Sequence, residues 1–204
     1  MNAIEGGKSR AAALAAVIWM LATVAMVAAA TPALAASGPK PIKQPGTFPI
    51  KINQSGSYIV TSNLVVTSKN QTVLKVTASY VTIDLGGFTI SGPDNGGTGI
   101  GVAASSVANV IVQNGSVSGF GGTGVALGDS STARNISAVS NGGVGISAGS
   151  GSLVSNCVAS GNGGFGLSFT DATSGYSNCV VTGSSTVSGG TSLGNNLCNG
   201  ASCP

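Results

Sequence analysis

Two aspartates are spaced so that they could act as a pair of catalytic carboxylates. Asp129 and Asp171 are 42 residues apart, with Ser150 midway between them. If the chain winds into coils of 21 residues, both side chains fall in one column, two coil steps or about 9.6 Å apart. Inverting glycosidases hold their two carboxyl groups roughly 6.5–9.5 Å apart. Together with the guanidinium of Arg134, which suits an acidic sugar, the two aspartates form a candidate ligand face.

The same aspartates also fit an ordinary turn. The stretches GDSS and TDAT that contain them are typical of turns in which a solvated carboxylate accepts hydrogen bonds from its own backbone. A catalytic acid needs a raised pKa instead. We therefore assign no catalytic residue from this pattern, and catalysis remains an alternative.

Composition excludes most other catalytic machinery. The chain has no histidine, and beyond residue 35 it has no glutamate and a single arginine, Arg134. Without histidine there is no Ser-His-Asp or Cys-His arrangement and no histidine-based metal centre. The sequence predicts no metal site and no cofactor.

Three columns of residues repeat with a period of 21, which indicates a solenoid. They are Gly124, Gly145 and Gly166; Asn114, Asn135 and Asn156; and Val125, Ile146 and Leu167. Each unit contains short alternating strands broken by Gly or Asn, and none shows the helical spacing of 3.6 residues. In the stretch YVTIDL, residues 80–85, the side chains of Val81, Ile83 and Leu85 should point inward. The fold class predicted is all-β, a single-stranded parallel β-helix.

Asn-Gly-Gly triplets recur at equivalent places in two successive units. They occupy residues 141–143 and 162–164. These residue types tolerate positive φ, so we expect each triplet to turn a corner of the coil. Asn141 and Asn162 should lie in one column, where stacked amides can form hydrogen bonds.

The chain divides into three parts. Lys8 and Arg10 precede an apolar run that ends in the small-residue pattern Ala33-Leu34-Ala35, which predicts a signal peptide over residues 1–35 with cleavage after Ala35. A retained membrane anchor is the alternative. A flexible linker over residues 36–46 and a β-helix domain with a C-terminal cap over residues 47–204 follow. The localisation predicted is secreted, periplasmic or cell surface, with no stable membrane span after cleavage.

Four cysteines suit an exported protein. Cys198 and Cys203 enclose four residues and are expected to form a disulfide in the cap. Cys157 and Cys179 should be stacked neighbours in successive coils, about 4.8 Å apart. They form either a second disulfide or two buried thiols, and the spacing does not decide between these states.

Aromatic side chains bear on a binding role, because an exposed ring can serve as a platform for a sugar. Tyr80 lies just before an inward-facing valine and is expected outside. Phe165 and Phe169 are expected in the core. An exposed strip formed by these two rings and Tyr176 is the alternative.

Several stretches resemble bacterial right-handed parallel β-helix proteins of the pectate-lyase-like superfamily. They include GSYIVTSNLVV, NVIVQNGSVSGFGGTGV, SNGGVGIS, NCVASGNGGFGLS and NNLCNGASCP, and the resemblance covers roughly residues 45–204. It implies a right-handed solenoid, for which we count five or six coils. Many such proteins are exported and act on or bind polysaccharides. The Ca²⁺-holding acidic cluster and the basic residue of the lyases have no counterpart in this sequence.

Three functions from different classes are consistent with the sequence. We favour a secreted or surface polysaccharide-binding scaffold without catalysis, whose partner is a polysaccharide or cell-envelope glycan. The alternatives are a polysaccharide lyase or glycoside hydrolase, and a structural or adhesive envelope protein. Nucleic acid is not expected as a partner, because the charge of the chain, +3, is too mild to imply one. Five of the six lysines and arginines beyond residue 35 lie before residue 76; a solvated surface is the favoured interpretation of this basic part, and weak attraction to an anionic polymer is the alternative. The oligomeric state is left open.

Overall fold

Parallel β-strands build the part of the chain that the computed structural model describes, which is residues 38–94, 96–102 and 106–204. No helix occurs among those residues. The signal peptide predicted for residues 1–35 lies outside them. The fold class predicted from the sequence is confirmed.

The strands form two sheets, which we call sheet A and sheet B. Sheet A has 14 strands: β1 (Lys40–Ile42), β3 (Gly56–Val60), β4 (Leu64–Val65), β6 (Val81–Asp84), β7 (Thr89–Ser91), β9 (Val110–Ser118), β11 (Thr132–Val139), β13 (Leu153–Ser155), β14 (Val158–Ser160), β16 (Gly175–Ser177), β17 (Val180–Thr182), β19 (Thr191–Ser192), β20 (Leu197–Cys198) and β21 (Ala201–Ser202). Sheet B has seven: β2 (Ile50–Ile52), β5 (Thr72–Val76), β8 (Thr98–Val102), β10 (Val125–Ala126), β12 (Ile146–Ala148), β15 (Phe165–Phe169) and β18 (Ser185–Ser188).

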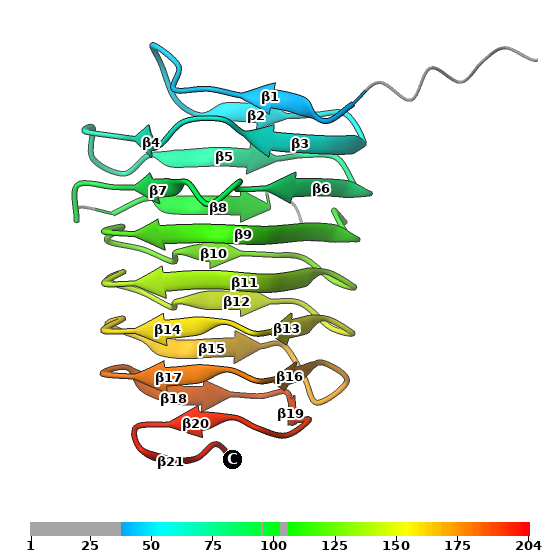
Figure 1. The fold of residues 1–204 in the computed structure, drawn as a ribbon, viewed down its shortest axis with the longest axis vertical. Coiled ribbons are helices and arrows are strands. Elements are labelled where there is room, and N and C mark those ends of the chain that lie inside the picture. Colours follow the sequence, from blue (N-terminus) through cyan, green and yellow to red (C-terminus); the bar gives the residue numbers. More distant parts are fainter. Residues whose placement is uncertain (1–37, 95, 103–105) are drawn as a thin grey trace, which may run out of the picture. The chain divides into compact units, whose positions relative to one another are not determined.

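Each coil runs through sheet A, turns, and returns through sheet B before it steps to the next level (Figure 1). In Figure 1 the strands of sheet A run to the left in front and those of sheet B run to the right behind as the stack descends, which is a right-handed path. Sheet B contributes one strand per coil, so its seven strands mark seven coils. The count of five or six coils was therefore slightly low.

The glycine column predicted from the sequence is confirmed. Val125 pairs in parallel with Ile146, and the residues before them, Gly124 and Gly145, stack at the same position. The amide of Val125 donates to the carbonyl of Gly145 at 3.0 Å. A Cβ added to Gly145 would lie 2.6 Å from the carbonyl oxygen of Gly166, so only glycine allows coils to approach this closely.

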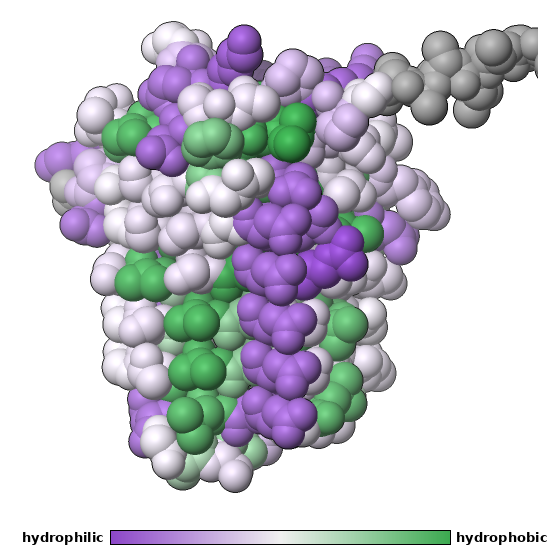
Figure 2. All heavy atoms as spheres, viewed as in Figure 1, coloured by the Kyte–Doolittle hydropathy of each residue, from purple (hydrophilic) through white to green (hydrophobic). Residues whose placement is uncertain are grey.

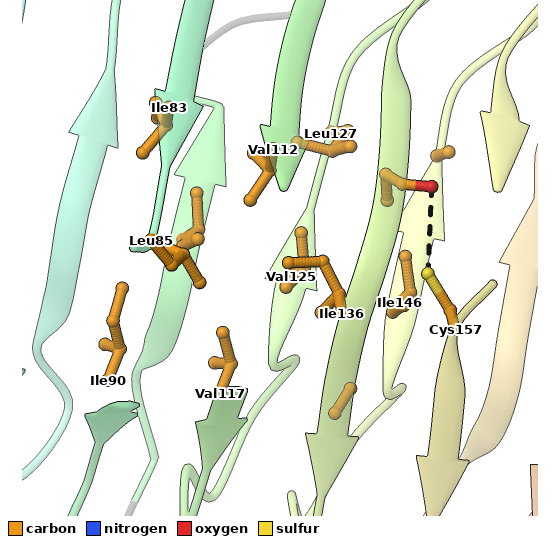
Figure 3. Packing of buried hydrophobic residues seen from close by; sticks show 14 of the residues in the cluster. Ile83, Leu85, Ile90, Val112, Val117, Val125, Leu127, Ile136, Ile146 and Cys157 are labelled. Atoms are coloured by element: carbon orange, nitrogen blue, oxygen red, sulfur yellow. Dashed lines mark hydrogen bonds between the residues drawn. The ribbon is translucent and has the colours of Figure 1, made fainter. Parts of the chain in front are cut away.

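The core fills the space between the sheets with aliphatic side chains, as Figure 3 shows for labelled residues that include Ile83, Val112 and Ile136. Val81, Ile83 and Leu85 are fully buried, as predicted. Each such side chain contributes roughly 1.5–3 kcal/mol through burial. The register places one inward aliphatic residue per coil along sheet B: Ile50, Leu74, Ile100, Val125, Ile146, Leu167 and Val187.

Buried asparagines connect the coils at the corner between the sheets. Asn141 and Asn162 are 1% and 3% exposed, and Nδ2 of Asn141 donates to Oδ1 of Asn162 at 3.0 Å. The stacking predicted for these amides is confirmed. Each triplet turns a corner of the coil, as predicted, since it lies between a strand of sheet A and a strand of sheet B. The positive φ that was expected within the triplets instead falls one residue earlier, on Ser140 (53°) and Gly161 (62°). Glycine is required at position 142 because the backbone of the previous coil lies very near: a Cβ there would lie 2.6 Å from the carbonyl oxygen of Gly121.

The N-terminal end of the stack is protected against further strand pairing. Strand β1 pairs only with β3, and it lies within residues 36–46, where the sequence suggested a linker. Proline at position 41 removes a backbone donor from this edge strand, and lysine at position 40 adds a charge. Proline and lysine on an edge strand discourage association with other chains.

The C-terminal end is closed by a change of strand direction. Strand β21 pairs antiparallel with β20, which ends the parallel ladder. Cys198 and Cys203 form the predicted disulfide, with Cα atoms 4.9 Å apart. The hydroxyl of Tyr176 donates to the carbonyl of Pro204. The last residues are thereby held against the final coils.

Loss of the disulfide between Cys198 and Cys203 is expected to lower the free energy of unfolding by about 2 kcal/mol. This is the stabilisation expected when so short a loop is closed in the unfolded chain, whose conformational entropy falls. Urea unfolding of the protein with and without reductant measures this change. In a Cys198→Ser, Cys203→Ser variant the reductant should have no effect, because Cys157 and Cys179 are free thiols. A reductant effect that persists in this variant would mean that these two thiols form a disulfide.

Candidate functional site

A column of left-handed residues precedes the strands at one edge of sheet A. It consists of Tyr80 (φ 58°), Asn109 (φ 57°), Ser130 (φ 52°) and Gly151 (φ 65°). Their backbones are linked from coil to coil, since the amide of Tyr80 donates to the carbonyl of Ala108 and that of Asn109 to the carbonyl of Asp129. Asparagine and glycine adopt this conformation readily, whereas a bulky residue loses roughly 1–2 kcal/mol in it.

Tyr80 gains little burial to offset that strain, because 71% of its surface is exposed. The expectation that it lies outside is confirmed. Tyr80 is therefore a candidate functional residue, because strained backbone conformations are found mainly at active sites and ligand-binding sites.

A shallow depression of about 360 Å³ adjoins the ring of Tyr80. The outward side chains of three successive coils line it: Tyr80, Thr82, Asn109, Ile111, Ser130 and Thr132. Strand alternation explains this set, because residues 80, 82, 109, 111, 130 and 132 share the outer face. The depression therefore offers one aromatic ring, hydroxyl and amide groups, and one aliphatic side chain.

Beside this depression, three polar side chains stack on β6, β9 and β11. Asp84 is the register partner of Gln113, and Gln113 is that of Arg134. Nε2 of Gln113 donates to Oδ2 of Asp84 at 2.7 Å, and Nε of Arg134 donates to Oε1 of Gln113 at 2.7 Å. The glutamine amide thus connects a carboxylate with a guanidinium, which places both charges on one short network.

The carboxyl group of Asp84 is held ionised by this network. Partial burial raises its pKa, but hydrogen bonds from the amide of Gly86 and from Gln113 and Asn114, with the charge of Arg134, outweigh burial and lower the pKa below its usual value. A carboxylate in this state is an acceptor for hydrogen bonds, not a proton donor.

An asparagine column continues this polar surface along the coils. Asn114, Asn135, Asn156 and Asn178 all have φ between 53° and 60°. The amide of Asn135 donates to Oδ1 of Asn114 at 3.0 Å. Figure 2 shows the hydrophilic band that runs down this face of the molecule, with hydrophobic groups on both sides of its lower part.

A second shallow depression of about 420 Å³ lies along this band, on the next outward positions of the strands. Ser116, Ser137 and Val158 are register partners on β9, β11 and β14 and form part of its lining, together with Asn135 and Asn156. Val158 is 40% exposed. The outer face of sheet A therefore carries two neighbouring depressions, separated by the network of Asp84, Gln113 and Arg134.

The ligand face predicted from the sequence is only partly assembled. Asp129 and Asp171 do meet the same residue, since Oδ1 of Asp129 accepts from the amide of Ser150 and Asp171 accepts from its side chain. Arg134 takes part in the network with Gln113 instead. Hydrogen bonds from the side chains of Thr173 and Ser150 lower the pKa of Asp171, which is the opposite of what a catalytic acid requires.

The other candidate residues are structural. Cys157 and Cys179 are buried free thiols, so the structure has the second of the two states that the sequence left open. A hydrogen bond with Cys179, together with burial, raises the pKa of the Cys157 thiol, which keeps it protonated and unreactive. Its sulfur donates to the carbonyl of Ala133 at 3.7 Å (Figure 3). Among residues 38–204, apart from positions 95 and 103–105, no group of three or more Cys, His, Asp or Glu side chains is arranged to hold a metal ion.

No protein-family model, curated protein or solved structure matches this chain. In the part of the chain that the structure describes, no helix is long and apolar enough to cross a bilayer. The fold is therefore established by the pairing register of the strands.

Sequence reasoning missed the network around Asp84, and it placed one aromatic ring wrongly. Phe169 is buried as predicted, whereas Phe165 is 40% exposed on sheet B. Tyr176 is buried and stacks on Phe169 with ring centroids 5.7 Å apart, so the exposed aromatic strip does not form. A signal for the Tyr80 column was available, since Tyr80 and Asn109 each precede a run of alternating apolar residues.

Proposed function

We propose that the protein is an exported or cell-surface scaffold that binds polysaccharide on the outer face of sheet A, of the kind found among pectate-lyase-like β-helix proteins. This proposal rests on Tyr80. The residue is 71% exposed although its backbone is strained, and its ring lies beside a depression rich in hydroxyl and amide groups. Sugars offer hydroxyl groups for such donors and acceptors and an apolar ring face for an aromatic side chain.

The charges near the depression favour a neutral glycan. Asp84 and Arg134 have opposite charges and are both hydrogen-bonded to Gln113, so little net charge faces a ligand there. A neutral polymer of hydroxyl-bearing rings meets no uncompensated charge on this surface. Binding without turnover agrees with the lowered pKa values of Asp84 and Asp171, because neither carboxyl group is suited to donate a proton.

Replacement of Tyr80 by asparagine should separate function from folding. The variant loses the aromatic contact, so affinity for a responsive neutral polysaccharide should fall by about 10-fold or more. It also relieves backbone strain, so the free energy of unfolding should rise by about 1 kcal/mol. Affinity electrophoresis against a polysaccharide panel and urea unfolding give the two values.

Phe165→Ser is the matched control for Tyr80→Asn, because Phe165 is an exposed aromatic residue on sheet B and the equivalent residue of the next coil is Ser185. Its binding should equal that of the unmodified protein. Equal losses in both variants, or unchanged binding by Tyr80→Asn, would contradict the assignment. Release of unsaturated or reducing-end sugars would favour an enzyme, and association with envelopes without glycan binding would favour a structural protein.

A further inference from the structure

Positive charge is concentrated at the N-terminal end of the stack. Residues 38–83 contain five lysines and no acidic residue. Four of them, Lys40, Lys43, Lys51 and Lys75, belong to the first two coils, on or next to strands β1, β2 and β5. We call these four residues the lysine cluster.

Two members of the lysine cluster are stacked directly on one another. Lys51 and Lys75 are register partners on the parallel strands β2 and β5, about 4.8 Å apart at the backbone, and both are exposed. The next residue in the same column is Gly101, which carries no compensating charge. Like charges at paired positions destabilise a sheet, so this arrangement weakens the fold unless something else favours it.

Lys40 is held in a fixed position at the same end. Its Nζ donates to Oε1 of Gln54 at 2.8 Å and lies 5.4 Å from the centre of the Tyr58 ring. A depression of about 290 Å³ is lined by Lys40, Lys43 and Lys51, with proline, isoleucine and tyrosine side chains between them. The side-chain amino groups of Lys43, Lys51 and Lys75 form no hydrogen bond and no ion pair with any residue that the structure describes.

We infer that the lysine cluster docks an anionic polymer, whose phosphate or carboxylate groups repeat along the chain. The depression receives lysines from β2 on sheet B and from β1 and the residue that follows it on sheet A, so a chain lying in it meets ammonium groups from both sheets. Repeated anionic groups relieve the repulsion between Lys51 and Lys75, which an isolated anion does less completely. This surface is separate from the Tyr80 depression, and its partner differs in charge.

Long-chain polyphosphate and polygalacturonate are suitable probes, with uncharged dextran as the negative polymer. Binding at low salt should weaken as salt rises, with a slope of log Kd against log salt of about 3 for four lysine contacts. The Lys51→Gln, Lys75→Gln variant should bind about 25-fold more weakly, that is about 5-fold for each lysine. Titration by fluorescence anisotropy with labelled polymers measures both effects.

Lys69→Gln is the matched control, because Lys69 is an exposed lysine that neither lines the depression nor, unlike Lys75, is the register partner of a lysine that does. It should change Kd by less than about 2-fold. Thermal unfolding adds a readout without ligand, since Lys75→Gln should raise Tm at low salt and lose that advantage at high salt. Equal losses in Lys69→Gln, no binding to either polyanion at low salt, or binding only to vesicles of anionic phospholipid would each overturn the inference.

Discussion

Replacing Gly145 by alanine is expected to destabilise the solenoid by about 3 kcal/mol or more, a large share of the stability of a typical domain. The added Cβ would lie 2.6 Å from the carbonyl oxygen of Gly166 and 2.8 Å from Nδ2 of Asn162. Both atoms belong to the next coil, so neither can move away without opening the ladder between two coils. Urea unfolding followed by circular dichroism measures the loss.

Gly101→Ala is the control for Gly145→Ala. Gly101 points outward on sheet B, where its register partner in the next coil is already Ala126. The nearest atoms to a Cβ there are the methyl groups of Thr72 and Thr98, at 3.3 and 3.6 Å, and no backbone atom is among its three nearest contacts. Its stability should stay within about 0.5 kcal/mol of the unmodified protein, or rise slightly because the unfolded chain loses freedom. Equal effects of the two alanines would contradict the stacking of the glycine column.

Replacing Asn141 by alanine should cost about 3 kcal/mol, since three hydrogen bonds of a buried side chain are lost at about 1 kcal/mol each. Oδ1 of Asn141 accepts from the amide of Phe120, and Nδ2 donates to the carbonyl of Val117 and to Asn162. The variant leaves the buried amide of Phe120 without this acceptor, whereas Oδ1 of Asn162 still accepts from the backbone amide of residue 141. The midpoint of thermal unfolding and the hydrogen-exchange rate of the Phe120 amide both report the loss.

A graded variant tests the role of the Asn141 side chain. In the last coil the equivalent position is Ser184, whose hydroxyl accepts from the amide of Asn162 at 2.8 Å. Asn141→Ser keeps one acceptor of this kind, so its loss should be about half that of the alanine variant. An alanine variant as stable as the unmodified protein would show that the buried amides do not hold the coils together.

The regular coils could be predicted from the sequence because stacking demands the same residue type at the same place. Gly124 and Gly145 each lie against the carbonyl oxygen of the glycine in the next coil, and this requirement repeats after 21 residues. The first coils were harder to count. The register steps from Ile50 to Leu74 and from Leu74 to Ile100, which are 24 and 26 residues. Variable loop lengths hide the period there, although the inward positions are kept.

The candidate site could be predicted only in part, because it depends on which face each side chain takes. Asp129 lies in the turn before β11, whereas Arg134 lies inside that strand and points outward beside Gln113. Their proximity in sequence therefore does not bring them together. The strain at Tyr80 also needed the structure, since the sequence places Tyr80 and Asn109 before equivalent strands but does not show their positive φ.

Chemical-shift mapping by NMR during titration with a neutral polysaccharide from the binding panel tests the glycan face most directly. Signals of the Tyr80 ring, the Ile111 methyl groups and the Thr132 methyl group should shift together, because these side chains line one depression. The NMR signals of the Val187 methyl groups on sheet B should not shift. Saturable shifts that leave Tyr80 and Ile111 unchanged while other residues respond would contradict the account.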